Sequence, residues 1–144
     1  SSPWRSTQEK RWNIPAYQTV ATWALDEGIN IVVDGADSFT DATRLASSDE
    51  RIVNLVQPTG SRVDPVNFAR LAQGAIVTIS GDTGMLHLAD AVGGNVLGLY
   101  GPTDPGRYGP THQRNNVLST FYRSKDLNDI TPGQVIERIE RLLE

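Results

Sequence analysis

Residues 80–87, Ser-Gly-Asp-Thr-Gly-Met-Leu-His, have the residue types and the order of an anion-binding turn. They follow a run of apolar, β-branched residues and precede a helical pattern, so the turn joins a strand to a helix. Small residues let a ligand approach the backbone there, and the N–H groups of the first helical turn attract an anion. Thr83 can donate a hydroxyl hydrogen to that anion, and His87 lies one turn further along on the same face. The segment predicts a phosphate site.

The same residues also have a structural explanation, which the sequence alone leaves open. Asp82 is a good N-cap residue for the helix, and His87 fits a partly buried histidine that is satisfied by its neighbours. A hydrolytic triad built on Ser80 and His87 is a weaker third hypothesis, because the chain has no Gly-x-Ser-x-Gly elbow.

Other polar and small residues also follow predicted strands. In an open α/β sheet, ligands bind outside the carboxyl ends of the strands, so these residues are candidates for the same site. They are Gly35 and Asp37 after one strand, and Gly101, Thr103 and Asp104 after another.

The loop over residues 101–116 is rich in glycine and proline, and it is too long and stiff to be a mere connector. The alternative is a rigid surface turn in which Arg107 is simply solvated. Near the N-terminus, Lys10 and Trp12 precede the first predicted helix. Either Trp12 anchors this segment beside solvated cations, or a cation here reaches an anionic ligand at the strand ends.

Helical and β patterns alternate along the chain, which predicts βαβ units, a parallel sheet and the α/β class. No linker-like stretch interrupts them, so we expect a single domain over residues 1–144. The predicted helices cover residues 15–27, 38–48, 65–74, 85–92 and a final helix opened by Thr131 and Pro132, and the predicted strands cover 29–33, 52–56, 75–79, 96–100 and 117–118.

Composition excludes several classes of protein. The 144 residues include no cysteine, which rules out disulfide scaffolds, cysteine-ligated zinc and thiol nucleophiles. The two histidines lack a metal-binding spacing, and neither a dinucleotide fingerprint nor a P-loop is present. A net charge of −4 argues against a nucleic-acid partner. No apolar run is long enough to span a membrane and the N-terminus has no signal sequence, so we expect a cytoplasmic protein.

Four motifs together resemble one known family. The chain is similar to the C-terminal domain of the family 9 glycosyltransferases, the lipopolysaccharide heptosyltransferases and their relatives. The resemblance covers nearly the whole chain, and its most specific part is the Asp-Thr-Gly-Met-x-His segment. The motifs are Lys10-Arg11-Trp12, Val32-Val33-Asp34-Gly35, the run Asp-Thr-Gly-Met-Leu-His-Leu-Ala-Asp-Ala over residues 82–91, and Gly-Pro-Thr-Asp-Pro over residues 101–105.

The resemblance implies half of a GT-B enzyme, a Rossmann-like three-layer sandwich that holds the nucleotide-sugar donor, typically ADP-heptose. It implies that Lys10 pairs with the diphosphate, that Thr83 and Gly84 hold phosphate oxygens, and that Asp82 and His87 lie near the phosphate and the donor sugar. The implied reaction is an inverting glycosyl transfer that uses no metal and no cofactor.

The family's N-terminal domain is expected to supply the catalytic base and the acceptor site, so the present chain alone is expected to be inactive. The resemblance implies a lipid-linked acceptor at the cytoplasmic face of the bacterial inner membrane, and peripheral membrane association through the full-length protein. A stand-alone nucleotide or nucleotide-sugar binding module without catalysis is the alternative.

Overall fold

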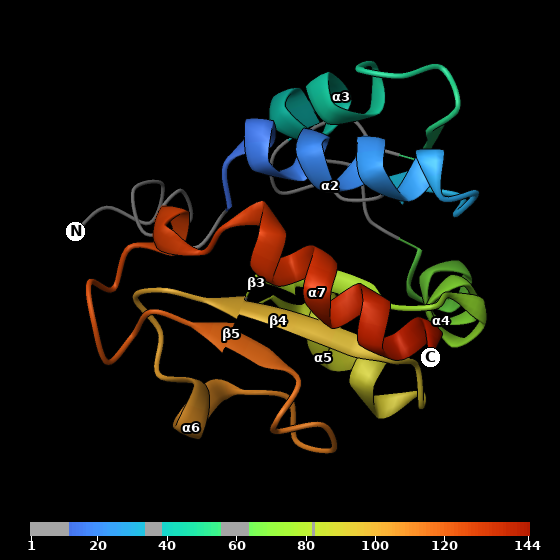
Figure 1. Cartoon of the computed structure of the whole chain (residues 1–144). Coiled ribbons are helices and arrows are strands. Elements are labelled where there is room, and N and C mark those ends of the chain that lie inside the picture. Colours follow the sequence, from blue (N-terminus) through green and yellow to red (C-terminus); the bar gives the residue numbers. More distant parts are fainter. Residues whose placement is uncertain (1–11, 34–38, 56–63, 82) are drawn as a thin grey trace. The chain divides into compact units, whose positions relative to one another are not determined.

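The computed structural model describes residues 12–33, 39–55, 64–81 and 83–144 (Figure 1). The described residues fall into two compact units, one over residues 13–64 and one formed by Trp12 with residues 65–144. The expectation of a single domain over residues 1–144 stays a prediction. Each unit is an α/β arrangement with a parallel sheet, as the alternating pattern predicts.

The smaller unit contains two helices and a two-stranded sheet. Helix α2 (Ile14–Asp26) begins after Asn13, whose side chain accepts a hydrogen bond from the Ala16 N–H. In the sequence, helix α3 (Phe39–Ala46) lies between strands β1 (Val32–Val33) and β2 (Val53–Asn54). The two strands pair with each other in parallel. Both strands are shorter than predicted. Alanines and branched side chains form the core of this unit: Ala21, Val33, Ala46 and Ile52.

The larger unit is built on a three-stranded parallel sheet in the order β3-β4-β5. The strands are β3 (Thr78–Gly81), β4 (Val96–Tyr100) and β5 (Val117–Ser119). All five residues of the central strand β4 are buried, which explains its continuous apolar sequence.

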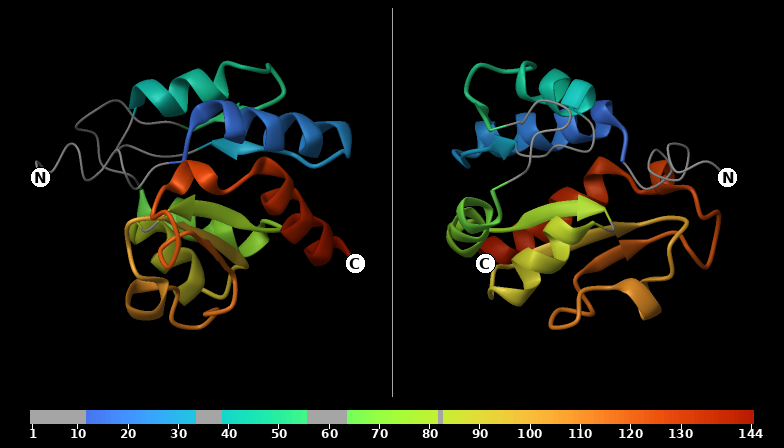
Figure 2. Two further views of the ribbon diagram at one scale, coloured as in Figure 1. Left: turned by 60° about the vertical axis from the view of Figure 1, so that its left-hand side comes forward. Right: turned by 180° about the vertical axis from the view of Figure 1, so that it is seen from behind.

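Helices cover both faces of this sheet. Helix α4 (Pro65–Gly74) packs beside α5 (Gly84–Ala91), and α5 contacts β3 and β4. Helix α7 (Pro132–Leu143) crosses the opposite face, as Figure 1 and the rear view in Figure 2 show together. The larger unit therefore has the layered arrangement expected of a Rossmann-like domain.

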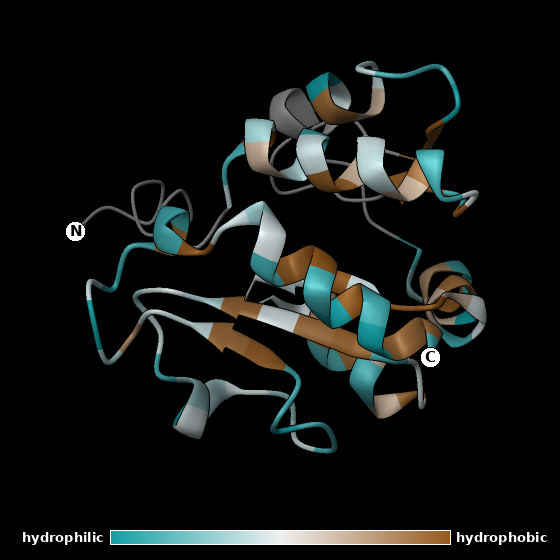
Figure 3. Ribbon diagram, in the orientation of Figure 1, coloured by the Kyte–Doolittle hydropathy of each residue, from teal (hydrophilic) through white to brown (hydrophobic). Residues whose placement is uncertain are grey.

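The residues at the start of α7 determine where this helix begins. Thr131 and Gln134 form a capping box, with Pro132 at the first helical position. Val135 and Ile139 are buried, and Figure 3 shows brown, hydrophobic stretches along β4 and β5, the strands beside α7. Leu142 and Leu143 are exposed, because they lie at the end of the helix.

Three features differ from the sequence-based expectation. Strand β3 starts later and ends later than predicted, because its register is fixed by pairing with β4, from Thr78 opposite Val96 to Gly81 opposite Leu99. The loop over 101–116 contains a short helix, α6 (Pro105–Tyr108), and a 3-10 helix, η1 (Leu127–Asp129), precedes α7. Elements of three or four residues show too few turns to have a detectable period.

Candidate functional site

The turn after β3 places Thr83 at the start of helix α5. Thr83 is the N-cap: its Oγ1 accepts from the Leu86 N–H at 3.3 Å, and its carbonyl accepts from the His87 N–H at 3.3 Å. The capping role that the sequence offered to Asp82 therefore belongs to Thr83. Asp82 itself lies outside the described residues.

A second hydroxyl reinforces this turn. Ser80 Oγ lies 3.0 Å from Thr83 Oγ1, and either oxygen can be the donor. Two hydroxyl groups bring two hydrogens, and the bond between them uses one. Whichever oxygen donates within the pair, the other hydroxyl keeps a hydrogen that can be donated to an anion. The pair is therefore a positioned donor beside the helix N-terminus.

The first residues of α5 complete the donor group. Gly84 is exposed, and a Cβ built on it would meet no atom within 4 Å. Thr83 accepts from the N–H groups of Leu86 and His87, whereas those of Gly84 and Met85 have no acceptor in the described part of the chain. These N–H groups carry the positive end of the helix dipole. The geometry can bind an anion such as a phosphate.

The structure describes only part of the predicted site. Thr83, Gly84 and His87 lie within one turn of each other on α5, and His87 is half-buried. Four other predicted residues lie outside the described residues: Lys10, Gly35, Asp37 and Asp82.

The 101–104 segment lies at the same edge of the sheet as the Thr83 turn. Strands β3 and β4 are parallel neighbours, with Gly81 opposite Leu99, so their carboxyl ends lie side by side. Gly101 is buried, and a Cβ there would come within 2.7 Å of the Leu127 backbone nitrogen, so only glycine fits. Thr103 is half-buried at this edge. The parallel pairing of β3 and β4 puts these two turns at one edge of the sheet, and their part in a common site stays a prediction.

Asp104 has a structural role that the sequence only partly indicated. Its carboxylate caps α6 by accepting from the Gly106 N–H at 2.9 Å, and it also accepts from the Tyr122 hydroxyl at 2.8 Å. The hydrogen bond to Asp104 raises the pKa of Tyr122, with burial and the carboxylate charge adding to the shift. Sequence reasoning missed Tyr122, because no local pattern connects residues 18 positions apart.

The sequence left two interpretations open for the segment around Trp12 and two for the loop that contains Arg107, and the structure describes both residues. Trp12 is an anchor: only 3% of it is exposed, and its Nε1–H donates to the Ile130 carbonyl at 2.9 Å. Arg107 is exposed, and its guanidinium carbon lies 5.3 Å from the centre of the Tyr108 ring. The exposed position agrees with the solvated-arginine alternative.

A hollow in the larger unit lies away from this edge. A cavity of about 480 Å³ is lined at the amino ends of β4 and β5 by residues that include Asp90, His112 and Gln113. Asp90 is buried there, and its two oxygens accept from the His112 N–H and from Gln113 Nε2, both at 2.9 Å. Because the carboxylate is satisfied by protein donors, we assign this network to stability and keep the site at the Thr83 turn.

The described residues contain neither a cluster of metal ligands nor a membrane-spanning helix. No group of three or more acidic or histidine side chains gathers there in a way that could hold a metal ion. Across the same residues, every helix is too short or too polar to cross a bilayer.

Comparison with known proteins identifies relatives over nearly the whole chain. The model of the glycosyltransferase family 9 (heptosyltransferase) matches residues 2–134. Lipopolysaccharide heptosyltransferase 2 of Escherichia coli is 30% identical over 93% of this chain and 43% of its own length. The lipopolysaccharide core heptosyltransferase OpsX of Haemophilus influenzae is 29% identical over 83% of this chain and 35% of its own length.

Solved structures agree with this match. The E. coli heptosyltransferase WaaC with ADP superposes with a TM-score of 0.75 at 28% identity, covering 93% of this chain and 40% of that one. A family 9 glycosyl transferase from Veillonella parvula superposes with a TM-score of 0.77 at 25% identity, covering 94% and 42%. The present chain thus spans about two-fifths of the length of these relatives.

Proposed function

The chain belongs to glycosyltransferase family 9, the heptosyltransferase family, and from this premise we propose that it binds the diphosphate of a nucleotide-sugar donor at the start of α5. One observation carries the proposal. The Ser80–Thr83 hydroxyl pair stands beside the N–H groups of Gly84 and Met85, which have no acceptor among the described residues. Such a group of fixed donors matches the oxygens of a phosphate.

The chemistry of glycosyl transfer explains why these donors matter. When the bond between the sugar and the diphosphate breaks, negative charge develops on the departing phosphate oxygens. Fixed N–H and O–H donors at the N-terminus of α5 stabilise that charge without having to reorganise. In this proposal Thr83 and Gly84 contact the diphosphate, Lys10 adds a cation, and His87 and Asp82 lie near the donor sugar. The transfer is inverting and requires no metal or other cofactor.

The names of the relatives support one choice of donor and acceptor. One structural neighbour was solved with ADP, and both curated relatives are named for lipopolysaccharide or its core. We therefore propose ADP-heptose as the donor and a lipopolysaccharide-type acceptor, with Gly35, Asp37, Gly101, Thr103 and Asp104 in the surrounding loops. A separate N-terminal domain supplies the catalytic base and the acceptor site, at the cytoplasmic face of the inner membrane, and the 144 residues alone bind donor without turning it over.

Calorimetric titration of the chain with ADP, UDP and GDP tests this proposal. ADP is expected to bind most tightly. Removing hydroxyl groups in the double variant Ser80→Ala/Thr83→Val is expected to weaken ADP binding by roughly 1–3 kcal/mol, and Lys10→Ala by a similar amount.

Two controls separate binding from folding. Thr83→Ser keeps the hydroxyl and the N-cap, so it should retain ADP affinity, and Thr111→Val changes an exposed threonine elsewhere in the same unit. If the double variant keeps its fold by circular dichroism and still binds ADP like the parent, the site assignment is wrong. If none of the three nucleotides binds the folded parent chain, the nucleotide proposal fails.

A further inference from the structure

The charge of the chain is unevenly distributed. Residues 105–125 contain four of the 13 basic residues and none of the 17 acidic ones, although the chain as a whole has a net charge of −4. All four of these cations, Arg107, Arg114, Arg123 and Lys125, are exposed, and in the described part of the chain none of them has a carboxylate partner. Unpaired cations gathered on an acidic protein point to an anionic partner.

Aromatic rings lie among these cations. Tyr108 is 47% exposed and Tyr122 is 75% exposed. Arg107 lies over the Tyr108 ring, and the ammonium of Lys125 lies 4.9 Å from the centre of the Phe121 ring. Phe121 and Tyr122 meet edge to face, with ring centres 5.0 Å apart.

Two regions of the chain are fastened together to make one surface. The Tyr122 hydroxyl donates to Asp104 at 2.8 Å, and Asp104 caps α6. A Cβ on Gly106 would lie 3.5 Å from the Tyr122 hydroxyl oxygen, so the turn over residues 120–125 contacts the first turn of α6. We call this the aromatic–basic surface, and its residues are Arg107, Tyr108, Phe121, Tyr122, Arg123 and Lys125.

The backbone of the turn is held in an unfavourable conformation. Lys125 has a φ of +60°, a region that side chains other than glycine rarely adopt. The Lys125 N–H donates to the Thr120 carbonyl at 2.7 Å, and buried Thr120 closes the turn by donating from Oγ1 to the Asp126 carbonyl at 2.9 Å. These two hydrogen bonds to Thr120 and from Thr120 hold the turn in this conformation.

We propose that the aromatic–basic surface docks this protein on an anionic lipid bilayer. Tyrosine is enriched in the headgroup region of membranes, because its ring is apolar and its hydroxyl is polar. Arginine and lysine are attracted by anionic lipids. The long stems of Arg107, Arg123 and Lys125 allow their charges to reach the headgroups while the rings enter the interface. The proposal stands on this surface alone and does not depend on the donor site at Thr83.

Sedimentation of the full 144-residue chain with lipid vesicles tests the proposal. The chain is expected to bind vesicles of phosphatidylcholine with phosphatidylglycerol at low salt and to dissociate from them at high salt. It is not expected to bind vesicles of phosphatidylcholine alone. Each cation contributes about fivefold in affinity, so Arg107→Gln/Arg123→Gln/Lys125→Gln should weaken vesicle binding by roughly 100-fold. Tyr122→Ser should weaken it further than Tyr122→Phe, which keeps the ring.

The control for this triple variant removes three positive charges from exposed arginines outside the aromatic–basic surface. The variant Arg44→Gln/Arg70→Gln/Arg141→Gln should keep most of the vesicle binding. Equal loss in both triple variants would overturn the proposal, as would equal binding to neutral vesicles or tighter binding to a single-stranded oligonucleotide. ADP titration of the surface variant is expected to match the parent. A loss of ADP affinity there would assign these cations to the donor site instead.

Discussion

The buried carboxylate of Asp90 accepts a hydrogen bond from Gln113 Nε2 at 2.9 Å, across 23 positions of the sequence. The same amide nitrogen donates to the Gly94 carbonyl, while Gln113 Oε1 accepts from the Val96 N–H and from Asn116. The pair thus fastens the connection between β4 and β5 to the end of α5 and the start of β4.

Removing this carboxylate should destabilise the protein strongly. In Asp90→Ala the His112 N–H and Gln113 both lose an acceptor, so the free energy of unfolding should fall by about 3 kcal/mol. Asp90→Asn keeps one acceptor oxygen, so the free energy of unfolding should fall by less in this variant. Urea denaturation followed by circular dichroism measures both values. Glu140→Ala, at an exposed position on α7, should change the unfolding free energy by less than about 0.5 kcal/mol. A comparably small effect of Asp90→Ala would mean that the network does not hold the loop.

The positive φ of Lys125 predicts that glycine is more stable than alanine at this position, the reverse of the usual order. Lys125→Ala and Lys125→Gly both remove the ammonium, but only glycine adopts a φ of +60° without strain. The glycine variant should therefore be more stable than the alanine variant by about 1 kcal/mol in thermal or urea unfolding. At the neighbouring Ser124, which lacks a positive φ, the alanine variant should be at least as stable as the glycine variant. Alanine being better than glycine at position 125 would show that the turn relaxes.

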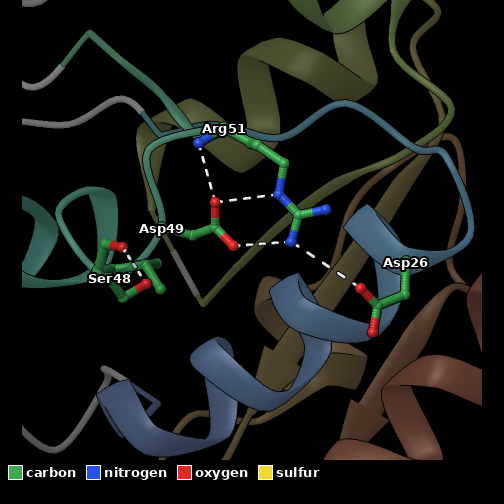
Figure 4. A network of polar contacts seen from close by, with 5 residues as sticks. Asp26, Ser48, Asp49 and Arg51 are labelled. Carbon is green, nitrogen blue, oxygen red and sulfur yellow. Dashed lines mark hydrogen bonds and ion pairs between the residues drawn. The ribbon is translucent and has the colours of Figure 1, made fainter.

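The smaller unit offers a prediction about acid titration. Arg51 donates from Nε and from a terminal nitrogen to Asp49, at 3.1 and 2.8 Å, and lies 3.9 Å from Asp26 (Figure 4). The side-chain hydrogen bonds from Arg51, the hydrogen bond from its backbone N–H and its charge lower the pKa of Asp49 from 3.8 to about 2. A lowered pKa in the folded state contributes stability above pH 4, which is lost as the pH falls from about 4 towards 2.

Replacing the arginine should therefore shift the titration of Asp49. In Arg51→Gln the pKa of Asp49 should rise towards its ordinary value, while the hydrogen bond from the backbone N–H of residue 51 keeps it slightly low. Carbon-detected NMR titration of the side-chain carboxyl measures this directly. Arg44→Gln removes an arginine from α3 and should leave the curve of Asp49 in place. A pKa that stays near 2 without Arg51 would assign the shift to another group.

Elements whose signals are local were predictable from the sequence. Helix α4 begins at Pro65 after Asp64, and α7 begins at Pro132 after Thr131, because a capping residue followed by proline marks a helix start. Strand β4 has the predicted bounds because a fully buried parallel strand is a continuous apolar run. Trp12 has the anchoring position that was one of the two alternatives left open by the sequence.

Features that depend on partners distant in sequence were not predictable. The register of β3 is set by β4, and the contact of Tyr122 with Asp104 requires α6 and the turn after β5 to meet. At the candidate site, the sequence indicated the anion-binding turn but gave the N-cap to Asp82. Both Asp82 and Thr83 are good caps, and only the backbone conformation at Thr83 distinguishes them.

Two glycines at the same edge of the sheet should respond oppositely to alanine. Gly101→Ala places a Cβ within 2.7 Å of the Leu127 backbone nitrogen, which cannot move independently of η1, so the unfolding free energy should fall by about 1–3 kcal/mol. Gly84→Ala meets no atom within 4 Å and should leave stability unchanged or slightly higher.

Ligand binding then separates packing from function at Gly84. If a diphosphate contacts the N–H groups of Gly84 and Met85, the added methyl occupies part of its approach, and ADP affinity should fall at least fivefold, about 1 kcal/mol. Calorimetry on the folded Gly84→Ala chain measures this effect. Because the substitution costs no packing, a drop in affinity cannot be attributed to unfolding. Unchanged ADP affinity would place the phosphates away from the start of α5.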